Sequence, residues 1–310
     1  MSKVVKGSKI ELYLNGFLRR VLPSGTLVAQ KEKLLKRISD TELVEVKKRV
    51  DYYCKDGSPC DKVFHHRVAD LKNPRTPKAY YFDTYEYARF FPDSQPINYE
   101  FGDVTWIPKL PAIVKSRPIA DDNQCSVLLN LDKVRHFAFV HGDRPFDSKK
   151  NMLIGRSAVY QPHRYDFYKK YFNHPLCDLG QVNREGGNPA WIKPRISIEK
   201  HLDFKFILSL QGNDVATNLK WIMSSNSIAV MPKPTIETWF MEGTLIGGTH
   251  YIEIKPDYSD LEEKLKFYIA DSAVCHDILE NAHRHCEKFY NPAAEDLCSL
   301  MVLEKYFKEF

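Results

Sequence analysis

The hydrophobic positions of the chain change their spacing about halfway along its length. Between residues 27 and 54 they recur at three- and four-residue steps, which predicts a helix. Residues 55–80 are rich in Pro, Lys and His and are predicted to form a loop. The segment 79–93 contains aromatic residues throughout, and Pro92 lies at its C-terminal end. Turns and short strands are predicted for 94–124.

From residue 126 onward, short apolar runs alternate with helical patterns. The runs predicted as strands are 126–131, 135–140, 151–155, 204–210, 227–231 and 250–254. Helices are predicted near 164–172, at 216–225, at 237–243 and after Ser259, which has the capping-box spacing to Glu262. The last fifty residues are predicted to be almost wholly helical, with a break at Asn291-Pro292.

Strands interleaved with helices of this length predict βαβ units and a parallel sheet, so the expected fold class is α/β. A polar segment at 141–150 interrupts the pattern and places a domain junction near residue 147. We therefore expect an N-terminal domain over 1–147 and a C-terminal domain over 148–310. The final helix is expected to pack back on the N-terminal domain.

Composition excludes several classes of protein. The 310 residues are 43% hydrophobic, 13% aromatic and 27% charged, which is typical of a folded chain and not of a disordered one. No apolar run is long enough to span a membrane, and the N-terminus lacks the features of a secretory signal. The seven cysteines form no Cys-x-x-Cys pair. These features predict reduced thiols, no zinc site and a cytoplasmic location.

Positive charge gathers at the N-terminal end of the chain. Residues 1–50 contain twelve Lys/Arg and five Asp/Glu, although the net charge of the whole chain is only +5. Such a surplus suits an anionic partner, and the alternative interpretation is a plain solvated helix face. Because the chain lacks an RNA-module signature, we expect no nucleic acid as a partner. Contact with an anionic membrane face remains open.

Two strand ends carry residues suited to binding a phosphate. At the first, Gly212 follows an apolar strand, and a helix with Asn218 and Lys220 comes next. At the second, Gly155, Arg156 and Ser157 end a strand. Arg164 follows eight residues after Arg156, and two arginines at one strand end can grip a diphosphate. The alternative interpretation of the first strand end is a simple turn at Gly212. For the second, it is that Arg156 and Arg164 form two surface salt bridges.

Several well-known motifs do not occur in this sequence. It has no GxxxxGK[ST] loop, no GxGxxG after a strand and no HExxH, which disfavours a P-loop kinase, a dinucleotide oxidoreductase and a zinc protease. It also has no clean Asp-x-Asp. We therefore expect no metal site, and a diphosphate would be bound by arginine, lysine and backbone N–H groups.

Short motifs over most of the chain resemble those of glycosyltransferase family 90, which contains protein O-glucosyltransferases, capsule-associated proteins and many lipopolysaccharide-biosynthesis proteins. The downstream motifs are Phe204–Gly212, Asn218–Ser225, Ser227–Val230, Glu237-x-Trp239, Thr249–Glu253 and Asp260–Lys264. The upstream motifs, which are closest to the bacterial type, are Arg49–Tyr53, Lys115–Ile119, Arg135–Phe137 and Lys150-x4-Gly155-Arg156. Protein-modifying members read Tyr-Phe-Arg-Gly where this chain has Ile-Gly-Arg-Ser, and they carry arginine at Asn218.

The resemblance implies a GT-B architecture, with two facing Rossmann-like domains and a mostly helical C-terminus. It implies inverting, metal-independent transfer of a sugar, glucose or xylose, from a UDP-sugar to a hydroxyl. The implied acceptor is a surface glycan such as lipopolysaccharide or capsule, with a glycolipid reached through the basic N-terminal region. The alternatives are a protein O-glycosyltransferase and a non-catalytic glycan- or nucleotide-binding member of the same fold. No cofactor is expected.

The resemblance also assigns site residues. The expected UDP-sugar contacts are Gly155, Arg156, Ser157, Arg164, Gly212, Asn218, Lys220 and Glu237. Inverting transfer needs one general base, and Asp83 occupies the place of the family's catalytic aspartate. Aromatic neighbours would raise its pKa toward a useful range. Asp103 is the competing base, and a helix N-cap is the structural alternative for Asp83.

Overall fold

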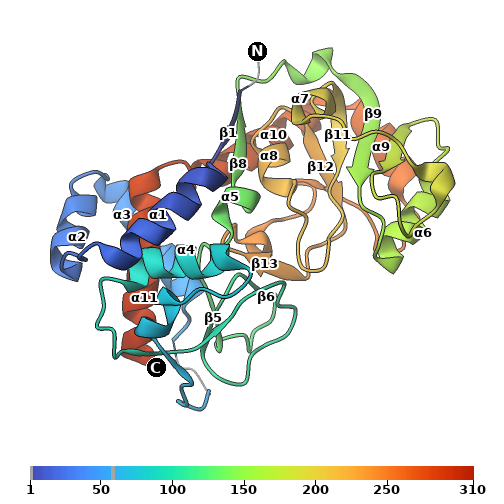
Figure 1. The fold of residues 1–310 in the computed structure, drawn as a ribbon. Coiled ribbons are helices and arrows are strands. Elements are labelled where there is room, and N and C mark those ends of the chain that lie inside the picture. Colours follow the sequence, from blue (N-terminus) through green and yellow to red (C-terminus); the bar gives the residue numbers. More distant parts are fainter. Residues whose placement is uncertain (1–2, 57–59) are drawn as a thin grey trace. The chain divides into compact units, whose positions relative to one another are not determined.

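The computed structural model describes residues 3–56 and 60–310, and it divides them into two compact units (Figure 1). Unit 1 contains the N-terminal residues through Lys6 together with Phe137–Pro234 and Thr244–Cys286. Unit 2 contains Gly7–His136, Thr235–Gly243 and Glu287–Phe310. The division predicted at residue 147 stays a prediction.

Unit 1 is an α/β unit built on a five-stranded parallel sheet in the order β10-β9-β11-β12-β14. These strands are β9 (Lys150–Ser157), β10 (Cys177–Gln181), β11 (Phe204–Leu208), β12 (Ile228–Met231) and β14 (Ile252–Glu253). The helices are α6 (Pro162–Tyr171), α7 (Ile198–His201), α8 (Leu219–Met223), α9 (Leu261–Ala270) and α10 (Ser272–Glu287). β1 (Lys3–Lys6) pairs antiparallel with β8 (Ala138–His141). The short 3-10 turns are η2 (Phe146–Ser148) and η3 (Pro189–Trp191).

The apolar runs explain the core of unit 1. All five residues of β11 are buried, as is expected of a central parallel strand covered on both faces. Its side chains pack with those of α6, α9 and α10 in one cluster that includes Phe167, Phe206 and Leu265. The strands predicted near 151–155, 204–210, 227–231 and 250–254 are therefore confirmed.

Unit 2 contains a smaller parallel sheet in the order β4-β5-β7. Its strands are β2 (His66–Arg67), β3 (Pro96–Ile97), β4 (Tyr99–Glu100), β5 (Ala112–Val114), β6 (Ser116–Pro118), β7 (Ser126–Leu128) and β13 (Ile236–Thr238). Its helices are α1 (Lys9–Val21), α2 (Leu27–Leu35), α3 (Asp40–Tyr53), α4 (Lys78–Ala88), α5 (Lys133–His136) and α11 (Pro292–Glu309), with the 3-10 turn η1 (Val68–Lys72). β13 pairs antiparallel with β6, and β2 with β3.

The C-terminal helix α11 belongs to unit 2 and packs against α2, α3 and α4 (Figure 1). It begins at Pro292, and the Asn291 side chain caps it, because proline fits the first turn of a helix but not its interior. A buried ion pair between Arg49 of α3 and Glu295 of α11 joins the two helices. Arg49 therefore does not belong to a solvated basic face.

Several predicted elements are wrong in detail. The single helix predicted over 27–54 is two helices, α2 and α3, separated at Lys36–Ser39. The segment 237–243 is not a helix, because it begins in β13 and continues into the 3-10 turn η4 (Glu242–Thr244). The predicted capping box at α9 does not form: the Ser259 hydroxyl bonds Asp257 instead. Residues 133–136 form α5, so the strand predicted from 135 begins at Ala138.

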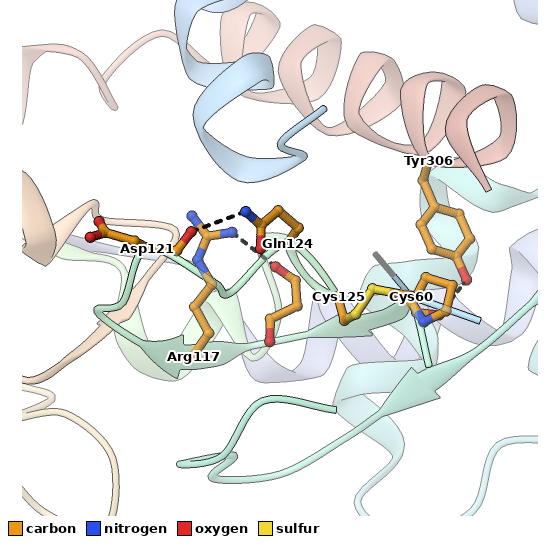
Figure 2. The surroundings of a disulfide bond; sticks show 8 residues. Cys60, Arg117, Asp121, Gln124, Cys125 and Tyr306 are labelled. Carbon is orange, nitrogen blue, oxygen red and sulfur yellow. Dashed lines mark hydrogen bonds between the residues drawn. A yellow bond between two sulfur atoms is a disulfide. The ribbon is translucent and has the colours of Figure 1, made fainter. Parts of the chain in front are cut away.

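One pair of cysteines contradicts the prediction that all thiols are reduced. Cys60 and Cys125 form a disulfide, with 5.8 Å between their Cα atoms (Figure 2). The other five cysteines form no disulfide, and all five are buried. Among residues 3–56 and 60–310, no helix has both the length and the apolar character needed to cross a membrane.

Candidate active site

The carboxyl ends of parallel strands are where α/β sheets usually bind ligands. In unit 2, the segments that follow β4, β5 and β7 bring Asp103, Lys115 and Asp132 to this edge. In unit 1, the last two residues of β9, Arg156 and Ser157, lie at the corresponding edge together with Gly212 in the segment after β11.

Asp103 lies beside Lys115 at the edge of the unit 2 sheet. The Lys115 ammonium donates to Asp103 Oδ1, and its Nζ also lies 6.0 Å from the centre of the Tyr80 ring. The Lys115 side chain is only 2% exposed, whereas that of Asp103 is 29% exposed. Asp103 therefore combines a fixed position with access to solvent.

Asp132 is a carboxylate that the sequence analysis did not single out. Its backbone is left-handed, with φ of 52°, a conformation that is uncommon for any residue except glycine. Its side chain is 15% exposed and lies 3.6 Å from Arg135 and 3.9 Å from His136. Burial raises its pKa. The available signal was a polar residue directly after an apolar strand.

Asp83 lies in the middle of α4 and is fully buried. The backbone N–H of Lys133 donates to Asp83 Oδ2 at 3.3 Å, and the Lys133 ammonium lies 3.8 Å from Oδ1. Burial raises the pKa of Asp83 to about 7. Because α4 begins at Lys78, the N-cap alternative for Asp83 is wrong.

The three aspartates interact electrostatically across this edge. The charge of Asp132 raises the pKa of Asp83, and the charge of Asp103 raises that of Asp132. Lys133 and Lys115 act in the opposite direction, since an ammonium favours the charged carboxylate. Through these charges the structure links both predicted bases and one further carboxylate, and we call the three residues the carboxylate cluster (Asp83, Asp103 and Asp132).

In unit 1, the residues at the end of β9 are held by their neighbours. A Cβ at Gly155 would lie 2.9 Å from a methyl group of Leu179, so close strand packing requires glycine there. Arg156 donates to the Asp178 carboxylate and carbonyl at 2.9 and 2.8 Å. The Ser157 hydroxyl lies 3.0 Å from that of Tyr168.

Arg164 and Asn218 hold the loop after β11. The Arg164 guanidinium donates to the carbonyls of Ala158, Leu210 and Gln211 at 2.7–2.9 Å. Asn218 donates to the Leu208 carbonyl at 2.9 Å and accepts from the Ser209 hydroxyl at 3.1 Å. The backbone at Gly212 is next to the Arg164 guanidinium, with 3.6 Å between an added Cβ and Nη2. These side chains therefore shape the edge of the unit 1 sheet.

Two further predicted donor contacts have different surroundings. Lys220 is fully buried, with its Nζ 5.9 Å from the centre of the Phe137 ring. Glu237 belongs to unit 2, where β13 places it opposite Arg117 of β6. Over residues 3–56 and 60–310, no three His, Cys, Asp or Glu side chains are grouped as a metal ion would require.

Comparison with known proteins identifies the family. The family model "Glycosyl transferase family 90" matches residues 130–306. An O-glucosyltransferase LpsA from Dichelobacter nodosus is 39% identical over 310 residues, covering 96% of this chain and 95% of that protein. An uncharacterized protein 027R from Frog virus 3 is 28% identical over 120 residues, or 37% of this chain and 12% of that protein. The chain therefore belongs to glycosyltransferase family 90.

Proposed function

We propose that this protein is an inverting, metal-independent glycosyltransferase that uses a UDP-sugar. It transfers glucose or xylose to a hydroxyl of a surface glycan such as lipopolysaccharide or capsule. Family membership supports the transferase activity. The Dichelobacter nodosus relative is named an O-glucosyltransferase, which supports glucose as the transferred sugar and an oxygen atom as its acceptor. The carboxylate cluster is the observation that carries the mechanism.

The proposed division of labour is that of a GT-B enzyme, with the donor on unit 1 and the acceptor on unit 2. The UDP diphosphate binds at the edge formed by the ends of β9 and β11, near Arg156, Ser157, Gly212 and the first turn of α6. Arg164 and Asn218 support this site by fixing the loop after β11. Backbone N–H groups at the start of a helix favour negative charge.

The chemical step needs one general base. A carboxylate of the cluster takes the proton of the acceptor hydroxyl, the hydroxyl oxygen bonds to the anomeric carbon, and UDP leaves with the bonding electron pair. Asp83 has a pKa of about 7, which suits a base near neutral pH, but its side chain is fully buried. Asp103 and Asp132 are part-exposed and complete the set of candidates.

We also propose that the protein lies at the surface of a membrane. The apolar residues Ile10, Leu14 and Val21 of α1 are 81%, 58% and 79% exposed. Arg20 lies in the last turn of the same helix, whereas the neighbouring Arg19 is ion-paired with Glu86 of α4. An exposed apolar face with basic residues on one helix is typical of proteins that lie on anionic lipid surfaces. This arrangement supports contact with a glycolipid acceptor.

UDP release from UDP-glucose and UDP-xylose, with and without a chelator, tests the activity. Replacing the base by asparagine should lower turnover by roughly 10²–10⁴-fold while UDP still binds. Turnover and UDP binding are measured for each of three single variants, Asp83→Asn, Asp103→Asn and Asp132→Asn. The matched control is Asp277→Asn, on the exposed face of α10. UDP binding without turnover in the unmodified protein would favour the non-catalytic alternative. Absence of UDP binding at millimolar concentration would contradict both.

A further inference from the structure

Unit 2 contains a cavity that the carboxylate cluster does not use. Its volume is about 270 Å³, and it is lined by Tyr52, Lys55, Ile119, Ala120, Asp121, Asn123 and Glu237. These residues come from the end of α3, the loop between β6 and β7, and β13. Figure 2 shows part of this loop, from Asp121 to Cys125, next to Arg117 and the Cys60–Cys125 disulfide.

Glu237 is held in place by two partners. Arg117, which is fully buried, donates from Nε to Glu237 Oε1 at 2.8 Å, and the Tyr52 hydroxyl donates to Oε2. Arg117 also donates to the carbonyls of Tyr52, Tyr53 and Ser126 at 2.8–3.2 Å. The carboxylate therefore has a fixed orientation, and each oxygen retains a lone pair for another donor.

Gly243 is part of this arrangement. A Cβ at this position would lie 2.6 Å from Glu237 Oε2 and 2.7 Å from the Tyr52 hydroxyl oxygen. Any larger residue would displace the carboxylate or the phenol. Backbone, buried cation and phenol together hold one carboxylate at the wall of a cavity, although a buried ion pair is by itself a poor source of stability.

Asn123 has an unmet hydrogen-bonding requirement. It is 1% exposed, and its Nδ2 donates to the Pro118 carbonyl at 2.9 Å. Its Oδ1 is buried and accepts no hydrogen bond from the described residues. A buried acceptor without a hydrogen bond is unfavourable, so a donor from a ligand would stabilise this wall.

The lining determines which chemical class fits. The carboxylates of Asp121 and Glu237 are balanced by Lys55 and by the buried Arg117, so the lining has no surplus of positive charge to favour a phosphate. Lys55 is a hydrogen-bond donor, and burial together with the charge of Arg117 lowers its pKa. Tyr52 and Ile119 add apolar surface. Acceptors, one donor and an apolar face match the hydroxyls and C–H face of a neutral sugar. The volume lies just below the roughly 300–1,000 Å³ of most ligand pockets, which suits one ring.

We infer that this cavity binds one neutral sugar unit of the acceptor glycan, with Asn123 and Glu237 accepting hydrogen bonds from its hydroxyls and Lys55 donating one. The identification of this sugar as part of the acceptor rests on the proposed function. This role for Glu237 differs from the donor contact that the resemblance implies.

A binding experiment with the full chain tests the inference. The binding of methyl glycosides of glucose, galactose and mannose is measured by calorimetry or ligand-observed NMR. At least one should bind the unmodified protein, and Asn123→Leu should weaken that binding about tenfold, the equivalent of one lost hydrogen bond. Asn281→Leu on α10 is the matched control. Lys55→Met, at a part-exposed position, provides a second variant if Asn123→Leu does not fold.

UDP binding measured on the same samples separates the two proposals. We expect the cavity variants to retain UDP affinity, because the proposed donor site is on unit 1. Equal glycoside binding by the unmodified protein and by folded Asn123→Leu and Lys55→Met would overturn the inference, as would absence of glycoside binding at millimolar concentration. If the unmodified protein did not bind UDP, the proposed function would be contradicted instead.

Discussion

Three aspartates of unit 2 illustrate how burial gives one residue type different chemical properties. Asp103 is part-exposed and paired with Lys115, Asp132 is held in a left-handed backbone, and Asp83 is fully buried in α4. The pKa rises for Asp83 and Asp132 because burial penalises the charged form more than their cationic neighbours favour it. Local sequence shows three acidic residues, and only their surroundings distinguish them.

The raised pKa of Asp83 predicts a specific pH dependence of stability. Its pKa is about 7 in the folded protein and 3.8 in an unfolded chain, so between these values the folded state holds a proton that the unfolded state has released. Stability should therefore fall as pH rises through this window, by about 4 kcal/mol. Urea unfolding of the wild type and Asp83→Asn, below and above the window, measures it.

The asparagine variant should lack this loss, so its stability relative to the wild type should increase as pH rises. Asp277→Asn, on the exposed face of α10, should follow the wild type and controls for a general effect of removing one carboxyl. An identical pH dependence in wild type and Asp83→Asn would show that Asp83 keeps its ordinary pKa.

At the scale of elements, helix starts show how a short motif depends on its neighbours. The spacing Ser-x-x-Glu stands at the start of both α3, at Ser39–Glu42, and α9, at Ser259–Glu262. At α3 it forms a complete capping box: Ser39 Oγ accepts a hydrogen bond from the Glu42 N–H, and the Glu42 carboxylate accepts one from the Ser39 N–H. At α9 the Asp257 carboxylate binds Ser259, and the cap position passes to Asp260.

Replacing the two serines should therefore have unequal effects. Ser39→Ala removes the cap of α3 and should lower the free energy of unfolding by about 1 kcal/mol. Ser259→Ala removes only an exposed bond to Asp257 and should cost less. Thermal or urea unfolding of both variants measures the difference. If Ser259→Ala were as destabilising as Ser39→Ala, the assignment of the two caps would be contradicted.

At the scale of the whole molecule, segments far apart in sequence complete each unit. Unit 2 takes β13 and α11 from beyond residue 234, and unit 1 begins with β1 at the N-terminus. The disulfide has the same long-range character, since Cys60 and Cys125 are 65 residues apart. Disulfides persist mainly in oxidising environments, so the cysteines do not support the predicted cytoplasmic location.

Counting thiols tests the disulfide. Unfolded without reductant, the protein should expose five reactive thiols, and after reduction seven, because only Cys60 and Cys125 are bonded. In the folded protein the other five thiols should react slowly, since all are buried and burial raises the pKa of Cys54 and Cys298 to about 12. Seven thiols without reductant would refute the disulfide.

Breaking the bond should also lower stability. A cross-link over a loop of this length typically contributes about 2–4 kcal/mol, chiefly by restricting the unfolded chain. The variants Cys60→Ser and Cys125→Ser should lose that amount, whereas reduction should add no further loss to either variant. Urea unfolding of the oxidised wild type provides the reference.

The sequence by itself determined the α/β class, the parallel strands of unit 1 and the family, because apolar runs and short motifs are local and keep their order along the chain. It indicated acidic candidates but could not show that Asp83, Asp103 and Asp132 interact. The pairing of Arg117 with Glu237 joins residues 120 positions apart. Only the tertiary structure decided such contacts. The periodicity of a segment shows which of its side chains lie on the same face of a helix or strand, but it does not show which other segment packs against that face.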